Sequence, residues 1–280
     1  AYAIEYDCLQ PTQLRQSLEH KEIAGFFSAG QLNGTSGYEE AAAQGLVAGA
    51  NAAAYVLDRP PLLLERDSSY IGVMLDDLVT KGVQEPYRLF TSLSEYRLLL
   101  RQDNADSRLT ELAAQHGLIT AKRREVYHAK QQAIEQEITR LENCRPGPAA
   151  LAPLGLETKP GDTLAALLRR QGVDYAMLCA LFPPPAPLEE QTAQQVEIAL
   201  KYKGYIDKQR QQVERFQKLE RRLLPEDLDY AQVRGLSTEA AQKLARLRPR
   251  SIGQASRITG VSPADIGVLF IHLQKNQKEE

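Results

Sequence analysis

The stretch that decides the fold is Gly25-Phe26-Phe27-Ser28-Ala29-Gly30-Gln31-Leu32-Asn33-Gly34-Thr35-Ser36-Gly37-Tyr38-Glu39-Glu40-Ala41. Its apolar run, residues 26–29, predicts a short buried strand, and the glycines that follow let the chain turn tightly. Ser36 and Glu39 have the spacing of a capping box, so a helix should begin here. The order strand, glycine turn, helix aims unpaired N–H groups at an anion or a carbonyl oxygen.

The segments around this stretch predict a mainly α-helical chain with a short α/β part at its start. Alternation over residues 2–7 predicts another strand, and the Ala-rich run 38–57 predicts a helix. Helical periodicity dominates from Ser69 onward, with Gly82 as an expected C-cap. Further helices are expected over 121–143, as one long helix over 188–224, and after Ser237, Ser251 and Ser262.

Composition excludes several classes of protein. The chain has 280 residues, of which 43% are hydrophobic and 25% charged, with a formal net charge of −2. This is ordinary for a globular protein, so any nucleic-acid signal must come from local clustering. Three scattered cysteines argue against a disulfide scaffold or a zinc site and fit a reducing compartment. The longest weakly polar run, residues 41–57, is too short and too mildly apolar to cross a membrane.

Basic residues cluster in two places. Residues 87–130 contain 8 Lys/Arg against 5 Asp/Glu, and residues 231–260 contain 6 against 1. The candidates for contact with RNA phosphates are Arg88, Arg97, Arg101 and Arg108, which are interleaved with aromatic side chains. Arg97 and Arg101 are four residues apart, which predicts one shared helix face. A solvated helix face with internal ion pairs is the alternative for this segment, and a helix-turn-helix DNA reader is the alternative for the terminal one.

A family resemblance extends nearly end to end. It rests on Gly30–Gly45 and, in order along the chain, on Tyr2-Ala3-Ile4-Glu5-Tyr6-Asp7, Tyr70-Ile71-Gly72-Val73, Asp76-Asp77-Leu78-Val79-Thr80-Lys81-Gly82, Glu85-Pro86-Tyr87-Arg88, Glu95-Tyr96-Arg97-Leu98, Asp103-Asn104-Ala105-Asp106 and Gly253-Gln254-Ala255-Ser256-Arg257-Ile258. These segments resemble the GidA/MnmG family of flavoproteins, which modify the wobble uridine of certain tRNAs.

The resemblance implies the carboxyl-terminal portion of a FAD-dependent enzyme. The family's dinucleotide-binding glycine motif and catalytic cysteines are not found in this sequence, so no catalytic residue and no metal ligand is expected here. Cys8, Cys144 and Cys179 match none of the catalytic cysteine motifs, and Cys8 is expected to be a small buried hydrophobic residue. The expected flavin-binding residues are Gln31, Asn33, Gly34 and Thr35. One departure is Leu93, where the family typically has Arg.

The resemblance also implies the wider setting of the enzyme. In that setting NADH is the reductant, tRNA is the substrate, an MnmE-type protein that hydrolyses GTP is the partner, and the intact enzyme is a cytoplasmic homodimer. The expected domains are 1–68 as the end of a FAD-binding α/β domain, 69–224 as a helical tRNA-binding region, and 225–280 as a helical unit for partner docking. The apolar run 266–271 exceeds what a short terminal helix needs for its own packing. The alternative is a stand-alone helical module that binds nucleic acid or protein without catalysis.

Overall fold

The computed structural model describes residues 7–155, 159 and 161–279 and divides the chain into two compact units. Unit 1 is discontinuous and consists of residues 1–97 and 211–280, whereas unit 2 consists of residues 98–210. The predicted domain boundaries after residues 68 and 224 remain a prediction. In the described part of the chain no helix is long and apolar enough to cross a membrane.

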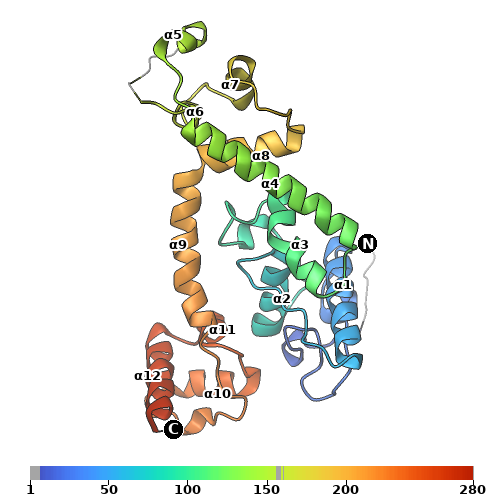
Figure 1. Cartoon of the computed structure of the whole chain (residues 1–280). Helices are drawn as coiled ribbons and strands as arrows, with labels where there is room; N and C mark the ends of the chain where they lie inside the picture. The colour runs from blue at the N-terminus through green and yellow to red at the C-terminus, as the bar shows by residue number, and fades with distance from the viewer. Residues whose placement is uncertain (1–6, 156–158, 160, 280) are drawn as a thin grey trace, which may run out of the picture. The chain divides into compact units, whose positions relative to one another are not determined.

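Unit 1 is built from helices and short 3-10 turns (Figure 1). Its helices are α1 (Tyr38–Val56), α2 (Tyr70–Lys81), α10 (Thr238–Leu247), α11 (Ile252–Arg257) and α12 (Pro263–Glu279), and its 3-10 helices are η1 (Pro11–Gln13), η2 (Gly30–Asn33), η3 (Thr91–Leu93) and η6 (Tyr230–Gln232). Helix α2 packs against η1, α1 and α11. A second core holds the carboxyl-terminal helices together around Tyr230, Leu244, Ile252 and Leu269.

The two segments of unit 1 are joined by buried charges. Asp76 on α2 is only 1% exposed, and its carboxylate accepts hydrogen bonds from Arg257 Nε at 2.7 Å and Nη2 at 2.9 Å. Gln254 Nε2 donates to the same carboxylate at 3.1 Å, and Arg66 Nη1 lies 3.2 Å from it. Arg257 also pairs with Glu220. Because Asp76 is buried and two of its partners lie on α11, the fold of α2 depends on the end of the chain.

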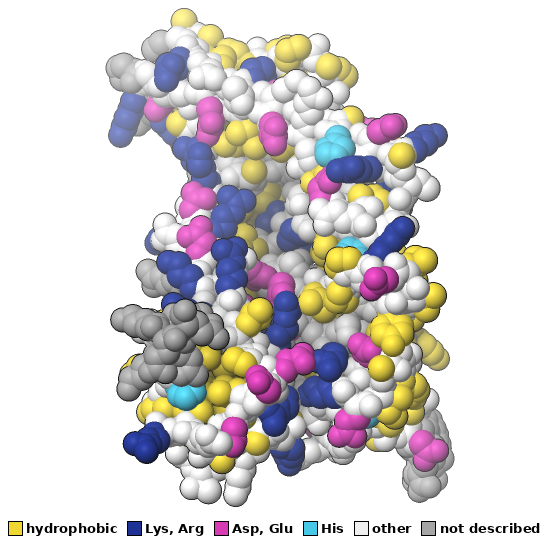
Figure 2. Space-filling view, turned by 60° about the horizontal axis from the view of Figure 1, so that its bottom comes forward, with side chains coloured by type: hydrophobic (Ala, Val, Ile, Leu, Met, Phe, Trp, Pro, Cys, Tyr) yellow, Lys and Arg dark blue, Asp and Glu magenta, His cyan; other side chains and the backbone are white. Residues whose placement is uncertain are grey.

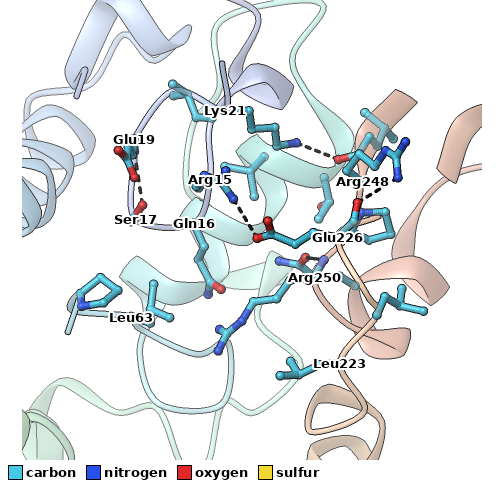
Figure 3. A pocket seen from close by; sticks show the side chains of 18 of the residues that line it. Arg15, Gln16, Ser17, Glu19, Lys21, Leu63, Leu223, Glu226, Arg248 and Arg250 are labelled. Atoms are coloured by element: carbon cyan, nitrogen blue, oxygen red, sulfur yellow. Dashed lines mark hydrogen bonds and ion pairs between the residues drawn. The ribbon is translucent and has the colours of Figure 1, made fainter. Parts of the chain in front are cut away.

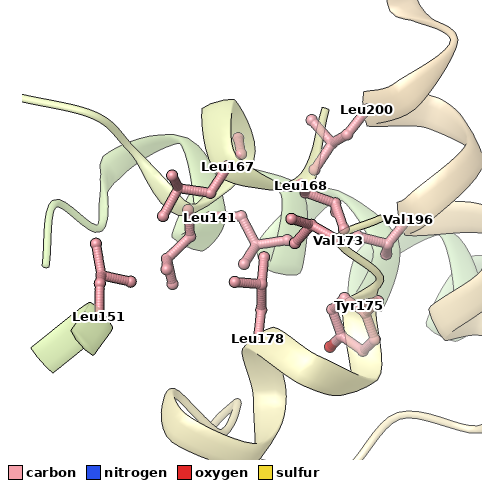
Figure 4. Close-up of a cluster of buried hydrophobic side chains, with 11 residues drawn as sticks. Leu141, Leu151, Leu167, Leu168, Val173, Tyr175, Leu178, Val196 and Leu200 are labelled. Carbon is pink, nitrogen blue, oxygen red and sulfur yellow. The ribbon is translucent and has the colours of Figure 1, made fainter. Parts of the chain in front are cut away.

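Unit 2 contains η4 (Gln102–Asn104), α3 (Ala105–Gln115), α4 (Ala121–Asn143), α5 (Pro148–Leu151), η5 (Ala152–Leu154), α6 (Leu164–Leu168), α7 (Tyr175–Leu181) and α8 (Glu190–Lys201). Helix α4 packs against α3, α6 and α8. Its carboxyl-terminal end contributes Leu141 to a core with Leu167, Leu168, Leu178 and Val196 (Figure 4). Helix α9 (Lys203–Glu220) runs from unit 2 into unit 1.

Several predicted elements are confirmed. The mainly α-helical class is correct, as are the helix over 121–143, the Gly82 cap of α2 and the Ser237 and Ser251 caps of α10 and α11. The helix predicted over 38–57 is α1, which ends one residue earlier.

Other predictions are wrong, each for a local reason. Residues 26–29 form no strand, because the chain turns at Gly25 (φ +74°) and Gly30 (φ +71°) and leaves room for a single bridge between Glu19 and Phe27. The strand expected over 2–7 falls mainly outside the described residues. The long helix expected over 188–224 is interrupted at Tyr202, two residues before Gly204, and its second part ends at Glu220.

Candidate functional site

The glycine-rich stretch folds as a turn that delivers the chain to the start of α1. Gly30–Asn33 form η2, and Gly34 follows in the left-handed conformation with φ +76°. The N-cap of α1 is Gly37, whose backbone is extended and which supplies no side chain to cap the helix. The predicted capping box of Ser36 and Glu39 is therefore wrong, since both side chains are exposed and the observed N-cap lies one residue after Ser36.

A buried polar network supports this turn from inside. Asn33 is fully buried, and its amide donates to Ser28 O and to Gln44 Oε1, both at 2.9 Å. Thr35 Oγ1 donates to Gly30 O and accepts from Gln44 Nε2, also at 2.9 Å. The side chains of Asn33 and Thr35 thus hold the turn in shape. Sequence reasoning missed Gln44, although it lies within the resembling stretch and on the same helix face as Glu40.

Gln31 is exposed, as is Leu32, whereas Asn33, Gly34 and Thr35 are buried. It stands at the start of the turn, close in sequence to the uncapped N-terminus of α1, and an amide can both donate and accept hydrogen bonds. The residues present therefore fit a flavin through the Gln31 amide and the backbone N–H groups of the turn, with Asn33, Gly34 and Thr35 shaping the backbone. The assignment of these four residues to flavin remains a prediction.

Glu40 decides what the N-terminus of α1 can accept. Its side chain is 5% exposed and lies in the first turn beside Gly37. A Cβ on Gly37 would lie 1.7 Å from Glu40 Oε2, so any larger residue here would displace the Glu40 side chain from its present position. A carboxylate already occupies the positive end of the helix dipole. The site therefore favours a neutral carbonyl oxygen over a phosphate.

The segment that follows α2 docks onto this turn. Tyr87 N donates to Gly34 O at 2.8 Å, and the Tyr87 hydroxyl donates to Asp77 at 3.1 Å. Glu40 Oε1 accepts from Leu89 N at 3.0 Å and lies 3.3 Å from Arg88 Nε. The proposed flavin turn and the first proposed tRNA-binding arginine are therefore held side by side. Glu40 was not singled out from the sequence.

The four candidate arginines lie in different settings. Arg88 and Arg97 belong to unit 1, and Arg101 and Arg108 belong to unit 2. Arg101 is held by Asp103 at 3.1 Å, whereas the Arg97 side chain is exposed and makes no hydrogen bond or ion pair with the described residues. Arg97 and Arg101 share no helix face, because residues 94–101 form no helix, which corrects the prediction. Figure 2 shows Lys and Arg side chains interspersed with Asp and Glu on the face displayed.

Arg108 is engaged within its own unit, and Leu93 is partly exposed. Arg108 Nε donates to Asn104 Oδ1 at 3.0 Å, and its Nη2 donates to Arg101 O at 2.9 Å, so the guanidinium braces the turn before α3. Leu93, where the family typically has Arg, lies on η3 with 37% of its surface exposed. Whether these arginines contact tRNA is still a prediction.

Two further expectations are corrected. The apolar run of α12 packs largely within its own unit, since Leu269 is buried and Ile266, Val268 and Phe270 contact the same core. Ile271 is the one large apolar side chain of that run that is mainly exposed, at 56%. Cys8 is exposed and is not a buried hydrophobic residue. The described residues contain no group of three or more His, Cys, Asp or Glu side chains that could hold a metal ion.

Comparison with known families gives three matches in chain order. Residues 1–60 match the family "Glucose inhibited division protein A". Residues 121–210 match the "tRNA modifying enzyme MnmG/GidA C-terminal helical domain", and residues 212–280 match the corresponding "C-terminal helical bundle".

Curated relatives and solved structures agree with these matches. The chain is 53% identical over 99% of its length to the tRNA uridine 5-carboxymethylaminomethyl modification enzyme MnmG of Caldicellulosiruptor saccharolyticus, and 51% identical over its whole length to that of Clostridium kluyveri. It covers 45% of each of these relatives. The structure of Aquifex aeolicus GidA in its form II crystal aligns with a TM-score of 0.84 at 42% identity, covering 95% of this chain and 43% of that one. The chain therefore belongs to the GidA/MnmG family and corresponds to its carboxyl-terminal portion.

Proposed function

We propose that this chain serves a FAD-dependent enzyme that modifies carbon 5 of the wobble uridine of tRNA. The observation that carries the proposal is the 53% identity over 99% of the chain to an enzyme named for tRNA uridine 5-carboxymethylaminomethyl modification. The chain spans about half the length of the curated relatives it matches, so it supplies part of such an enzyme. Its own part is to complete the flavin site and to bind tRNA and a partner protein.

At the flavin site, the chain orients the cofactor. FAD, once bound, supplies electron transfer, with NADH as the reductant. Gln31 would hold the flavin or its ribityl chain through an amide that can both donate and accept, and the backbone N–H groups at the start of α1 would favour a carbonyl oxygen. Asn33 and Thr35 act indirectly, because their side chains are bound to Gln44 and hold the turn around Gly34.

At the tRNA site, Arg88, Arg97, Arg101 and Arg108 contact phosphates. The Tyr87–Leu89 segment supports this assignment, because it is hydrogen-bonded to Gly34 and Glu40 beside the proposed flavin turn. A phosphate bound by Arg88 would bring its nucleotide close to the flavin. Proximity of this kind is what a reaction between a bound cofactor and one chosen base requires.

The same proposal includes a GTP-hydrolysing MnmE-type partner that docks on residues 225–280, a homodimeric intact enzyme and a cytoplasmic location. The basic excess of residues 231–260 supports an auxiliary RNA contact in this segment. The apolar run of α12 no longer supports docking, since most of it packs internally. Ile271 is the exposed position of that run where docking should be tested first.

A chimeric enzyme tests the activity. Residues 1–280 replace the matching portion of the Caldicellulosiruptor saccharolyticus enzyme in a bacterium that lacks its own MnmG gene. Mass spectrometry of tRNA nucleosides should then detect the carboxymethylaminomethyl modification, and a Gln31→Ala chimera should yield less of it at an equal protein level. A folded, flavin-loaded chimera that forms no modified uridine would contradict the proposal.

Two measurements test the sites on this chain. The isolated chain should bind FAD weakly or not at all, so a yellow preparation with one flavin per chain would count against a shared site. Arg97→Ala should weaken tRNA binding and flatten the slope of log affinity against log salt by about 0.7 to 0.9, the value of one phosphate contact. Arg221→Ala, at an exposed arginine of the same unit, is the control. An unchanged slope for Arg97→Ala would remove that residue from the tRNA site.

A further inference from the structure

A cavity of about 590 Å³ lies inside unit 1, and neither the four residues proposed for flavin nor the four arginines proposed for tRNA line it. Its lining comes from residues 14–21, from the end of α1 and the segment after it, and from residues 223–226 and 247–250 (Figure 3). The volume falls within the range of about 300–1,000 Å³ that is typical of small-molecule sites.

The walls are apolar and partly aromatic. Phe27, Leu63 and Ile258 line the cavity together with the rings of Tyr55 and Tyr230. Ring systems of a ligand would replace water against these side chains, which is favourable by roughly 25 cal/mol per Å² of apolar surface buried. A ligand for this cavity therefore needs an apolar, preferably aromatic, body.

The charged lining is strongly one-sided. It holds five cationic side chains, Arg15, Lys21, Arg59, Arg248 and Arg250, against two acidic ones, Glu19 and Glu226. One of the acids is already engaged, because Glu19 Oε1 accepts from Gly25 N at 2.9 Å. The other pairs with Arg15 at 3.2 Å.

Of the remaining cations, only Arg250 has an ion pair among the described residues, and that pair is long. Lys21 Nζ donates to the carbonyl oxygens of Thr12 and Leu247, both at 2.7 Å, and Arg248 Nη1 donates only to backbone carbonyl oxygens. The Arg59 guanidinium makes no hydrogen bond or ion pair with the described residues, and that of Arg250 reaches Glu65 only at 3.8 Å. Burial, and to a lesser extent the neighbouring Arg15 charge, lower the pKa of Lys21 to about 8.

We propose that this cavity binds an aromatic carboxylate, sulfonate or phosphate, with the ring against Phe27 and Leu63 and the anion against Arg59 and Arg250. The charge excess supplies the attraction, and the two weakly engaged guanidinium groups supply forks that match the geometry of such anions. The proposal does not rest on the tRNA-modifying function. None of the four residues proposed for flavin and none of the four arginines proposed for tRNA lines the cavity, although Arg248 and Arg250 lie in the basic segment 231–260.

Three small probes separate recognition of the aromatic ring from recognition of the anion. 2-Naphthoate carries both the ring and the charge, 2-naphthalenemethanol carries the ring alone, and inorganic phosphate carries the charge alone. Isothermal titration calorimetry of the chain should show one site for 2-naphthoate, bound at least tenfold more tightly than either other probe and weakened by added salt. Naphthoate fluorescence offers a second readout, since the chain contains no Trp.

Variants locate the bound probe. Arg59→Ala, which removes no described side-chain hydrogen bond or ion pair, should weaken 2-naphthoate binding at least threefold, and Arg59→Ala with Arg250→Ala at least tenfold. Leu63→Trp should fill part of the cavity and weaken binding without unfolding the chain, as circular dichroism would verify. Arg123→Ala, at an exposed arginine of unit 2, is the control and should leave the affinity unchanged.

Each alternative result overturns the proposal. Equal affinity for the alcohol would show an apolar pocket without anion recognition. Unchanged affinity in folded Arg59→Ala and Leu63→Trp would place the probe elsewhere. No measurable binding of 2-naphthoate would exclude an aromatic anion site in this cavity.

Discussion

Glu40 is a buried carboxylate whose two oxygens have different surroundings. Oε1 accepts from Leu89 N and lies near Arg88, whereas Oε2 is buried without a hydrogen-bond partner among the described residues. Burial alone would raise the pKa of Glu40, but the Leu89 N–H and the Arg88 guanidinium more than offset it and leave the pKa below its usual value. The carboxylate therefore stays charged and fixes the segment that carries Arg88.

The first prediction concerns this residue. Glu40→Ala should lower the free energy of unfolding by about 1–3 kcal/mol, because the Leu89 N–H loses its acceptor. Glu40→Gln should cost less, since an amide oxygen can still accept that hydrogen bond. Urea unfolding measures both, and exposed Glu39→Ala, expected within about 0.5 kcal/mol of the parent, is the control. Equal stability of Glu40→Ala and Glu39→Ala would show that the contact is not formed.

The second prediction concerns Asp265, which joins the starts of two helices. Its carboxylate accepts from Ser237 N at 2.8 Å and from Ser262 N and Oγ at 2.9 and 2.6 Å. The hydrogen bond from Ser237 N, followed by those from Ser262, lowers the pKa of Asp265 to about 2. A carboxyl pKa depressed by folding stabilises the native state above the unfolded pKa of roughly 4, and this stabilisation is lost as pH falls toward 2.

Asp265→Asn should therefore lower the free energy of unfolding on the order of 2 kcal/mol at pH 7, and the deficit should shrink steadily below pH 4. Urea unfolding at pH 7, 5 and 3 gives the comparison. Asp227→Asn, at an exposed aspartate of the same unit, is the control. A deficit that does not depend on pH would mean that the Asp265 charge contributes nothing.

At the scale of elements, helix α2 depends on a close approach of backbones. A Cβ on Gly72 would lie 2.2 Å from Glu65 O, so α2 can pack against residues 64–65 only with glycine there. A Cβ on Gly45 of α1 would meet nothing within 4 Å. The two glycines thus stand in helices of the same unit and differ in the space around them.

Opposite effects are expected when each is replaced by Ala. Gly45→Ala should stabilise the chain by about 0.5–1 kcal/mol through helix propensity, whereas Gly72→Ala should destabilise it despite the same gain, because the Glu65 backbone must move. Thermal unfolding of both variants checks this pair. A stabilising Gly72→Ala would show that α2 tolerates a wider separation from residues 64–65.

Elements defined by local signals could be predicted from the sequence, and those defined by distant contacts could not. The helix over 121–143 follows from its own periodicity, and the structure confirms it. Residues 84–101 also carry charged and aromatic residues at helical spacing, yet only η3 forms among them. Tyr87 N donates to Gly34 O and Leu99 N donates to Gln209, so this segment is held by residues that are distant in sequence.

In the candidate site, too, features set by local signals could be predicted and features set by distant contacts could not. The glycine turn and its approximate helix start were predicted because glycine spacing is a local signal. The roles of Glu40 and Gln44 depend on which face of α1 packs against the turn and against the segment that contains Tyr87. No local sequence pattern predicts that packing. The inward orientation of Asn33 and Thr35 has the same origin.

At the scale of the whole molecule, the Asp76 network gives the fourth prediction. Arg257→Met should lower the free energy of unfolding by about 3–5 kcal/mol, because the buried Asp76 carboxylate loses the guanidinium that helps to balance its charge. The double variant Asp76→Asn/Arg257→Met should cost less than the sum of the single variants. Arg250→Met, which breaks an exposed pair at 3.8 Å, is the control and should cost under about 1 kcal/mol. Additive costs in the cycle would exclude a direct coupling.

The same network changes how partner docking should be tested. Deleting residues 225–280 removes Gln254 and Arg257 from Asp76 and Leu247 O from Lys21, so the truncated chain should lose stability within residues 7–97. Loss of partner binding would then follow from unfolding. A surface variant such as Ile271→Asp, with the core left intact, separates the two effects.

The discontinuity of unit 1 has a consequence for synthesis on the ribosome. Asp76 and Arg257 are separated by 181 positions, and at roughly 5–20 residues per second the arginine emerges about 9–36 s after its carboxylate partner. During that interval unit 2 can complete its own core, because all of its residues are made before Gln211. The nascent chain should therefore contain a folded unit 2 while unit 1 is still incomplete. A pause or a rare-codon cluster after residue 210 would prolong exposure of α2 to chaperones and proteases.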